Sequence, residues 1–307
     1  MNLREWALPV YTIMIQLATG ALLALWVIRS RLYSRHRNEE MEQVARIPAL
    51  IIFATICIAI LGAHFHLSKP YLSFLAVLNV GHSWLSREIL LTMAFILVMG
   101  WLIFLVWFIP GRRRMITLLG WIAIGLGLAT IYSMARVYLL PTQLAWNSLT
   151  TILSYYGEML LLGATALSAI LLMDLNFYHD QELDRVRLND TTLKTALKGL
   201  AAVSLISLVI TLVLVNGHFS WLRAHQEESA LVSMRLLLDL YQPLFVARMA
   251  MSISGVAWLL LGLWRNLKMH AAIKDMIVPA YFATLLVLVG EILGRFLFYA
   301  IHVRIGI

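Results

Sequence analysis

The residues best able to do chemistry in this sequence are ionisable side chains set at the ends of long apolar segments. His66 closes one such segment, Arg87 and Glu88 open the next, and Arg136 and Tyr138 close the one after it. A histidine at a water boundary can accept a hydrogen bond and then a proton, and a carboxylate can pass a proton on to water. An arginine stabilises negative charge that develops on oxygen. These groups therefore suit the removal of protons from a hydroxylated ligand.

A second set of ionisable residues lies within the later apolar segments, namely Glu158, Arg248, Glu291 and Arg295. Glu291 and Arg295 are four residues apart, so in a helix they share one face and can pair. Charged residues inside a membrane are rare and are functional candidates by default. Intramembrane ion pairs also commonly do no more than fix helix packing, and the sequence leaves both interpretations open.

The first set has structural alternatives too. His66 can bond to backbone at a helix end, Glu88 can cap a helix start, and Arg136 and Tyr138 can be interfacial anchors. A zinc site built from His64 and His66 is weakly supported, because no carboxylate or thiol set stands at ligand spacing. No metal site is predicted.

The elements that must position these residues are membrane-spanning helices. The 307 residues are 61% hydrophobic and 13% charged, whereas soluble domains carry about 25% charged residues. Unsatisfied backbone groups cannot face lipid, and the apolar runs lack the alternation of barrel strands. We predict an all-α integral membrane protein whose residues 1–307 form a single transmembrane domain. Its eight expected spans are 7–28, 47–66, 86–109, 115–137, 151–173, 196–216, 242–264 and 276–299.

The charge of the loops predicts the orientation of the bundle. Fifteen Lys and Arg residues fall in loops on one side, and only five fall on the other, namely Arg4, Lys69, Arg223, Arg235 and Arg304. The positive-inside rule places the richer side in the cytoplasm and both termini outside. The candidate residues then lie in the outer half of the membrane. The net charge of +8 is explained by these loops and by contact with lipid headgroups, so nucleic-acid binding is not expected.

The outer segment between the second and third spans differs from the other connections. Residues 67–85 are apolar and include Pro70, which indicates a re-entrant or interfacial stretch. Apolar backbone at membrane depth must be buried against protein or line a cavity. The segment therefore predicts a functional region at the same outer face as the ionisable residues.

Redox cofactors are not expected inside this chain. Cys57 is the only cysteine, and an iron–sulfur cluster needs about four ligands. None of the nine histidines falls in the middle of a predicted span, so a haem between helices is not expected either. A chain that takes electrons from a ligand at the outer face would need a redox partner docked nearby.

Short motifs resemble the membrane-anchor subunit of anaerobic dimethyl sulfoxide reductase, the DmsC family. The matching runs are HLSKP at 66–70, LN at 78–79, WLSREI at 84–89, RVY at 136–138 and GEILGRFLFY at 290–299, with His302 after them. They come in the order of the family and lie at outer span ends. Ser68 stands where the family has glycine.

The resemblance implies an eight-span anchor in the bacterial inner membrane with both termini outside. On its outer, periplasmic side it would hold a four-cluster iron–sulfur subunit and a molybdopterin catalytic subunit. It would bind menaquinol and oxidise it to menaquinone for the respiration of dimethyl sulfoxide or a similar oxide. His66 and Glu88 would be the quinol-site residues. The further pocket candidates are Arg87, Arg136, Tyr138, Arg248, Glu291 and Arg295.

Two other functions remain open from the residues alone. A small-solute transporter would place polar groups near the bilayer midplane, with broken helices and often inverted repeats. The charges here lie toward the outer side and no repeat is evident. A purely structural anchor would need no polar cluster at all.

Overall fold

The computed structural model describes residues 7–35, 40–66, 70–177, 190–225, 227–269 and 272–303, and within them it contains helices and no strands. Eight of these helices are long and apolar enough to cross a membrane. They are α1 (Ala7–Arg35), α2 (Glu40–His66), α3 (Trp84–Phe108), α4 (Arg113–Tyr138), α5 (Leu149–Phe177), α6 (Asp190–Ala224), α8 (Gln242–Lys268) and α9 (Ile277–Ala300). The predicted all-α membrane class is confirmed.

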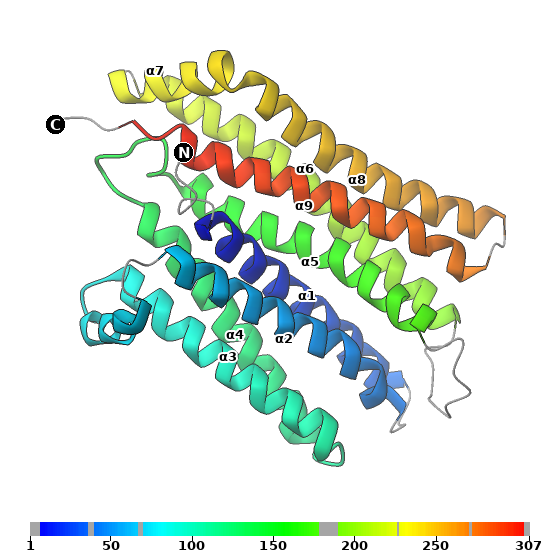
Figure 1. The fold of residues 1–307 in the computed structure, drawn as a ribbon. Helices are drawn as coiled ribbons and strands as arrows, with labels where there is room; N and C mark the ends of the chain where they lie inside the picture. The colour runs from blue at the N-terminus through cyan, green and yellow to red at the C-terminus, as the bar shows by residue number, and fades with distance from the viewer. Residues whose placement is uncertain are drawn as a thin grey trace.

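The long helices run alternately up and down, so α1 begins and α9 ends at the same end of the bundle (Figure 1). We call this the proximal end. The starts of α3, α5 and α8 and the ends of α2, α4 and α6 lie there as well. Which side of a membrane the proximal end faces stays a prediction from loop charge.

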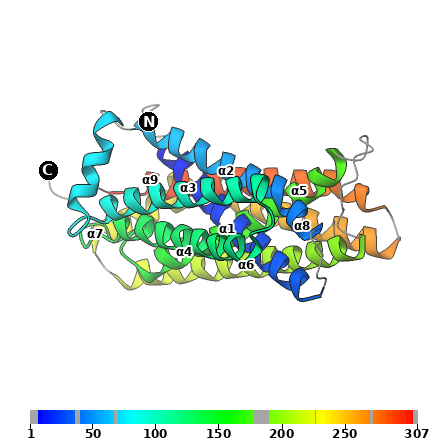
Figure 2. The ribbon, with the colours of Figure 1, turned by 90° about the horizontal axis from the view of Figure 1, so that it is seen from below.

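Several short helices complete the described chain. They are η2 (Pro70–Asn79), α7 (Glu228–Arg235), η3 (Leu236–Leu240) and η4 (Ile273–Met276). The first three lie at the proximal end, where η2 stands off from the bundle (Figure 2). The apolar stretch expected to be re-entrant or interfacial thus holds a 3-10 helix, and Leu78 on it is 84% exposed.

The helices extend beyond the spans expected from hydropathy, and α6 does so most. Hydropathy predicts it over residues 196–216, but it runs from Asp190 to Ala224. Hydropathy marks only the part of a helix that suits lipid, whereas backbone hydrogen bonding can continue past it. Residues 217–241, expected as a loop, therefore contain the last turns of α6 together with α7 and η3.

Helices α1 and α5 form the centre of the bundle. In their most apolar windows 72% and 83% of the residues are buried, against 22–39% in the other six spans. α1 packs on α2, α4 and α5, and α5 packs on α6 and α9, as Figure 1 also shows. The polar side chains of Gln16 on α1 and Glu158 on α5 therefore face protein and not lipid.

Two glycines let the central helices approach closely. A Cβ atom built on Gly20 of α1 would overlap the carbonyl group of Met159 in α5, and one built on Gly163 of α5 would overlap the backbone of Gly20. Small residues permit such backbone contact between membrane helices. The crossing brings Gln16, one turn before Gly20, against Tyr155 and Glu158 in the preceding turn of α5.

Candidate functional site

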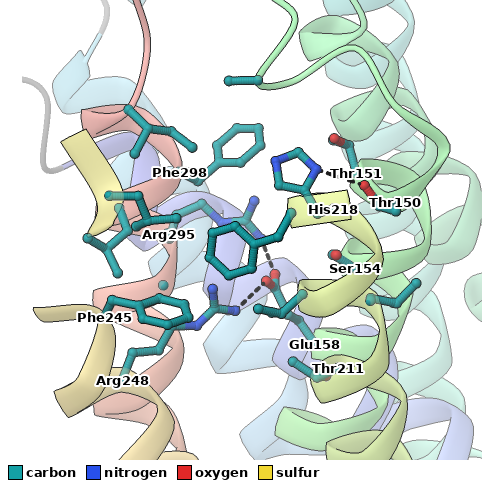
Figure 3. A pocket seen from close by; sticks show the side chains of 18 of the residues that line it. Thr150, Thr151, Ser154, Glu158, Thr211, His218, Phe245, Arg248, Arg295 and Phe298 are labelled. Carbon is teal, nitrogen blue, oxygen red and sulfur yellow. Dashed lines mark hydrogen bonds and ion pairs between the residues drawn. The ribbon is translucent and has the colours of Figure 1, made fainter. Parts of the chain in front are cut away.

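Two arginines and two glutamates form a buried ion network in the half of the bundle made by α5, α8 and α9. Arg248 Nη2 donates to Glu158 Oε1 and to Glu291 Oε2, each at 3.2 Å, and Arg295 donates to Glu158 Oε2 (Figure 3). The second oxygen of Glu291 accepts from Ser252 at 3.0 Å. The pairing of Glu291 with Arg295 suggested by their spacing is not formed, because each finds an oppositely charged partner on another helix.

Helix α1 completes the network with an uncharged residue. Gln16 Nε2 donates to the carbonyl of Tyr155 at 2.8 Å and to Glu158 at 3.2 Å, while its oxygen accepts from Arg295 at 2.9 Å. The Arg295 guanidinium also lies 3.9 Å from the centre of the Tyr155 ring. Sequence reasoning missed Gln16, although a single glutamine in an apolar span is a usable signal.

A cavity opens beside this network between α5, α6, α8 and α9. Its volume is about 100 Å³, which admits several water molecules at roughly 10–15 Å³ each. Hydroxyl groups of Thr150, Thr151, Ser154 and Thr211 line it together with His218, and Arg248, Arg295 and Glu158 also line it (Figure 3). Its other walls include Phe219, Phe245 and Phe298.

A second polar cluster surrounds Glu88 in the half of the bundle made by α1 to α4. Glu88 is only 7% exposed, and among the described residues it takes part in no ion pair. The Tyr11 hydroxyl lies 2.7 Å from Thr92 Oγ1, which donates to the Glu88 carbonyl at 2.8 Å. The capping role considered for Glu88 belongs to Ser83, whose hydroxyl accepts from the Ser86 amide at 3.3 Å.

Arg87 points away from Glu88 and holds the turn that precedes α3. It donates to the carbonyls of Val80 and Gly81, both at 2.8 Å. Its guanidinium lies 4.3 Å from the centre of the Trp84 ring, and that of Arg136 lies 4.8 Å from the same centre. Both cations thus gather on one indole, close to the start of α3.

Tyrosines from α4, α5 and α9 lie between the two clusters. The hydroxyls of Tyr138 and Tyr299 are 2.9 Å apart, and the rings of Tyr138 and Tyr155 pack together. Glu88 interacts electrostatically with all three tyrosines, and Arg295 interacts with them too. The three tyrosines thus lie within electrostatic range of both clusters.

The structure therefore does not gather the candidate residues into one group. Arg87, Glu88 and Arg136 lie on α3 and α4, while Arg248, Glu291 and Arg295 lie on α8 and α9, with Tyr138 between the two groups. The side chain of His66 lies outside the described part of the structure. Its backbone ends α2 at the proximal end.

Eight long apolar helices that bury ionisable groups toward one end define a multi-pass membrane protein with a polar interior site. The family described as DMSO reductase anchor subunit (DmsC) matches residues 1–301, and the chain belongs to that family. The resemblance of the short motifs is thereby confirmed. The chain is accordingly the membrane anchor of a molybdoenzyme complex, where it associates with a catalytic molybdoenzyme subunit and an iron–sulfur subunit.

Similar proteins align over almost the whole chain. The YnfH subunit of an anaerobic dimethyl sulfoxide reductase of Escherichia coli K12 is 26% identical over 306 residues, which cover 98% of this chain and 96% of the relative. The C subunit of the anaerobic dimethyl sulfoxide reductase of Haemophilus influenzae is 25% identical over 314 residues, covering 100% and 98%. The similarity therefore includes both halves of the bundle.

Proposed function

We propose that the chain oxidises menaquinol at the Glu88 cluster and passes the electrons to the iron–sulfur subunit. The observation that carries this proposal is a buried carboxylate without an ion-pair partner among the described residues, beside the hydroxyl of Tyr11. A carboxylate that is paired with a cation is stabilised in its charged form and exchanges protons less readily. An uncompensated one surrounded by hydroxyls fits the head of a quinol, which has two hydroxyl groups to lose protons from.

The proposed reaction releases two protons and two electrons from one menaquinol, leaving menaquinone. Glu88 accepts a proton from one hydroxyl, and His66 accepts the proton of the other. Arg136 is close enough to α3 to donate to the oxygen that becomes negative during this step. The electrons go to the nearest cluster of the partner subunit, and we infer that the partner docks at the proximal end.

The orientation predicted from loop charge also predicts the side of the membrane on which the protons are released. With the Lys- and Arg-rich loops in the cytoplasm, the proximal end faces the periplasm of a bacterial inner membrane. Glu88 and His66 then release their protons on the outer side. Respiration of dimethyl sulfoxide or a related oxide by the catalytic subunit consumes the electrons.

The test is to replace Glu88 by Gln and His66 by Ala, separately, in the assembled complex. We expect quinol-dependent reduction of the terminal acceptor to fall by about a hundredfold or more, the usual loss when a general base is removed. Reduction by an artificial donor that feeds the partner subunits directly should be unchanged. Glu228→Gln, an exposed carboxylate at the same end of the bundle, is the matched control. Normal quinol oxidation by both variants would overturn the assignment.

The structural-anchor alternative is favoured by one observation, namely that the ion network is balanced in charge. Two arginines and two glutamates compensate each other, so this half of the bundle can serve packing alone. An intact complex that binds no quinone analogue anywhere would support this alternative over quinol oxidation.

A further inference from the structure

The Glu88 carboxyl lies at the end of a short chain of hydroxyl groups. Tyr11 of α1 faces this carboxyl as its hydrogen-bond partner, and the Tyr11 hydroxyl oxygen lies 2.7 Å from Thr92 Oγ1 on α3. Thr92 comes one turn after Glu88 and donates to the Glu88 backbone carbonyl at 2.8 Å. Tyr11, Thr92 and Glu88 are only 5%, 6% and 7% exposed. Each proton in this chain therefore has a protein group as its partner.

The number of protons in the chain decides which form of Glu88 it suits. Each hydroxyl has one proton to donate. A carbonyl only accepts, so the contact of Thr92 with the Glu88 carbonyl uses the Thr92 proton. Tyr11 then supplies the proton for its own contact with Thr92 and turns a lone pair toward the Glu88 carboxyl. A lone pair accepts from a protonated carboxyl and repels a carboxylate. This arrangement therefore suits protonated Glu88.

The same oxygen atoms also permit the opposite arrangement. When Thr92 turns its O–H bond from the carbonyl to Tyr11, the Tyr11 proton becomes available to the carboxylate of Glu88. The Glu88 carbonyl keeps the backbone hydrogen bond that it accepts within α3. A hydrogen bond to a charged acceptor is roughly twice as strong as a neutral one, which offsets the lost Thr92 contact. Two hydroxyl rotations thus fit both forms of Glu88 without movement of any carbon or oxygen atom.

The other ionisable groups that face Glu88 do not replace Tyr11. Tyr138 of α4, Tyr155 of α5 and Tyr299 of α9 lie within electrostatic range of Glu88. The Tyr138 and Tyr299 hydroxyls are 2.9 Å apart and pair with each other. In the part of the chain that the structure describes, the carboxyl is hydrogen-bonded by Tyr11. Tyr11 is thus the group through which α1 acts on the carboxyl.

We propose that Tyr11 is a positioning residue for quinol oxidation, which together with Thr92 holds the Glu88 carboxyl in both its charged and its protonated form. The inference rests on the proposed function for the proton that Glu88 accepts. One quinol hydroxyl gives that proton to the carboxylate, while Tyr11 and Thr92 only turn their own O–H bonds. No proton leaves through Tyr11, and the electrons go to the partner subunit. Because no heavy atom moves, the transfer needs little reorganisation.

The first test deletes the hydroxyls in the assembled complex. Tyr11→Phe removes the partner of both forms of Glu88, so we expect kcat for quinol oxidation to fall by about tenfold with an unchanged KM. Thr92→Val should lower kcat by about threefold, and Thr92→Ser, which keeps the hydroxyl, should restore it. Tyr156→Phe is the matched control, because the Tyr156 hydroxyl donates to the Leu128 carbonyl at 3.0 Å. Equal kcat values for Tyr11→Phe and Tyr156→Phe would overturn the proposal.

Infrared difference spectra recorded between high and low pH separate this inference from the proposed function. Each carboxyl that gains a proton shows a C=O stretching band, and the Glu88 band is the one that Glu88→Gln lacks. We expect this band to shift in Tyr11→Phe and to stay in place in Tyr156→Phe, because only the first removes a hydrogen bond of the carboxyl.

The outcomes are distinct. Normal quinol oxidation by Glu88→Gln would overturn the proposed function and the role of Tyr11 with it. Loss of quinol oxidation in Glu88→Gln, together with an unshifted band in Tyr11→Phe, would overturn the role of Tyr11 alone. The absence of a Glu88 band at every pH would do the same, because the inference needs a carboxyl that gains and loses a proton.

Discussion

The two halves of the bundle bury carboxylates in opposite ways. Glu158 and Glu291 are held by arginines, a glutamine and a serine from α1, α8 and α9, with every carboxylate oxygen accepting at least one hydrogen bond. Glu88 has hydroxyl neighbours and, among the described residues, no cation as a partner. The first arrangement fixes charges in place, while the second leaves a carboxylate free to change its protonation. Burial alone therefore does not mark a reactive group.

The largest difference between the two halves of the bundle is expected when each carboxylate is neutralised in turn. Glu158→Gln removes the charge that faces both Arg248 and Arg295, and breaking a buried ion pair costs about 3–5 kcal/mol. Glu88→Gln removes no ion pair within the described part of the chain, so we expect the free energy of unfolding to change by less than about 1 kcal/mol. Denaturant titration of the two variants in detergent measures both. Equal losses would show that the two carboxylates are held in the same manner.

The next largest effect on stability is expected where α1 and α5, one from each half of the bundle, cross with their backbones in contact. Gly163→Ala puts a methyl group into the backbone of Gly20, so α1 and α5 must separate and Gln16 must move from Glu158. Overpacking of this kind costs about 1–3 kcal/mol. Gly125→Ala in α4 is the control, because a Cβ there meets nothing within 4 Å and alanine favours helix. Thermal unfolding should show a lower midpoint for the first variant only.

Much of the fold followed from the sequence, while the arrangement of the site did not. Apolar length identifies a span because lipid tolerates no unsatisfied backbone, and the motif at 290–299 identified Glu291 and Arg295 as candidates. Sequence spacing within one helix suggested that these two pair, but their partners come from helices far apart along the chain. A single glutamine in an apolar span marks Gln16, and adjacency in a helix puts Arg87 and Glu88 on different faces, but neither signal gives the residues that they meet. Such contacts depend on how the helices cross.

The smallest expected effect compares two buried tyrosines that differ in one hydrogen bond. Tyr11 has its hydroxyl 2.7 Å from Thr92 Oγ1, so Tyr11→Phe should lower the free energy of unfolding by about 1 kcal/mol. Tyr155→Phe removes a hydroxyl that has no partner in the described residues, so it should leave stability unchanged or slightly raised. Denaturant titration of the complex without added quinone makes this measurement. An equal loss of stability in both variants would show that the Tyr155 hydroxyl has a partner of similar strength.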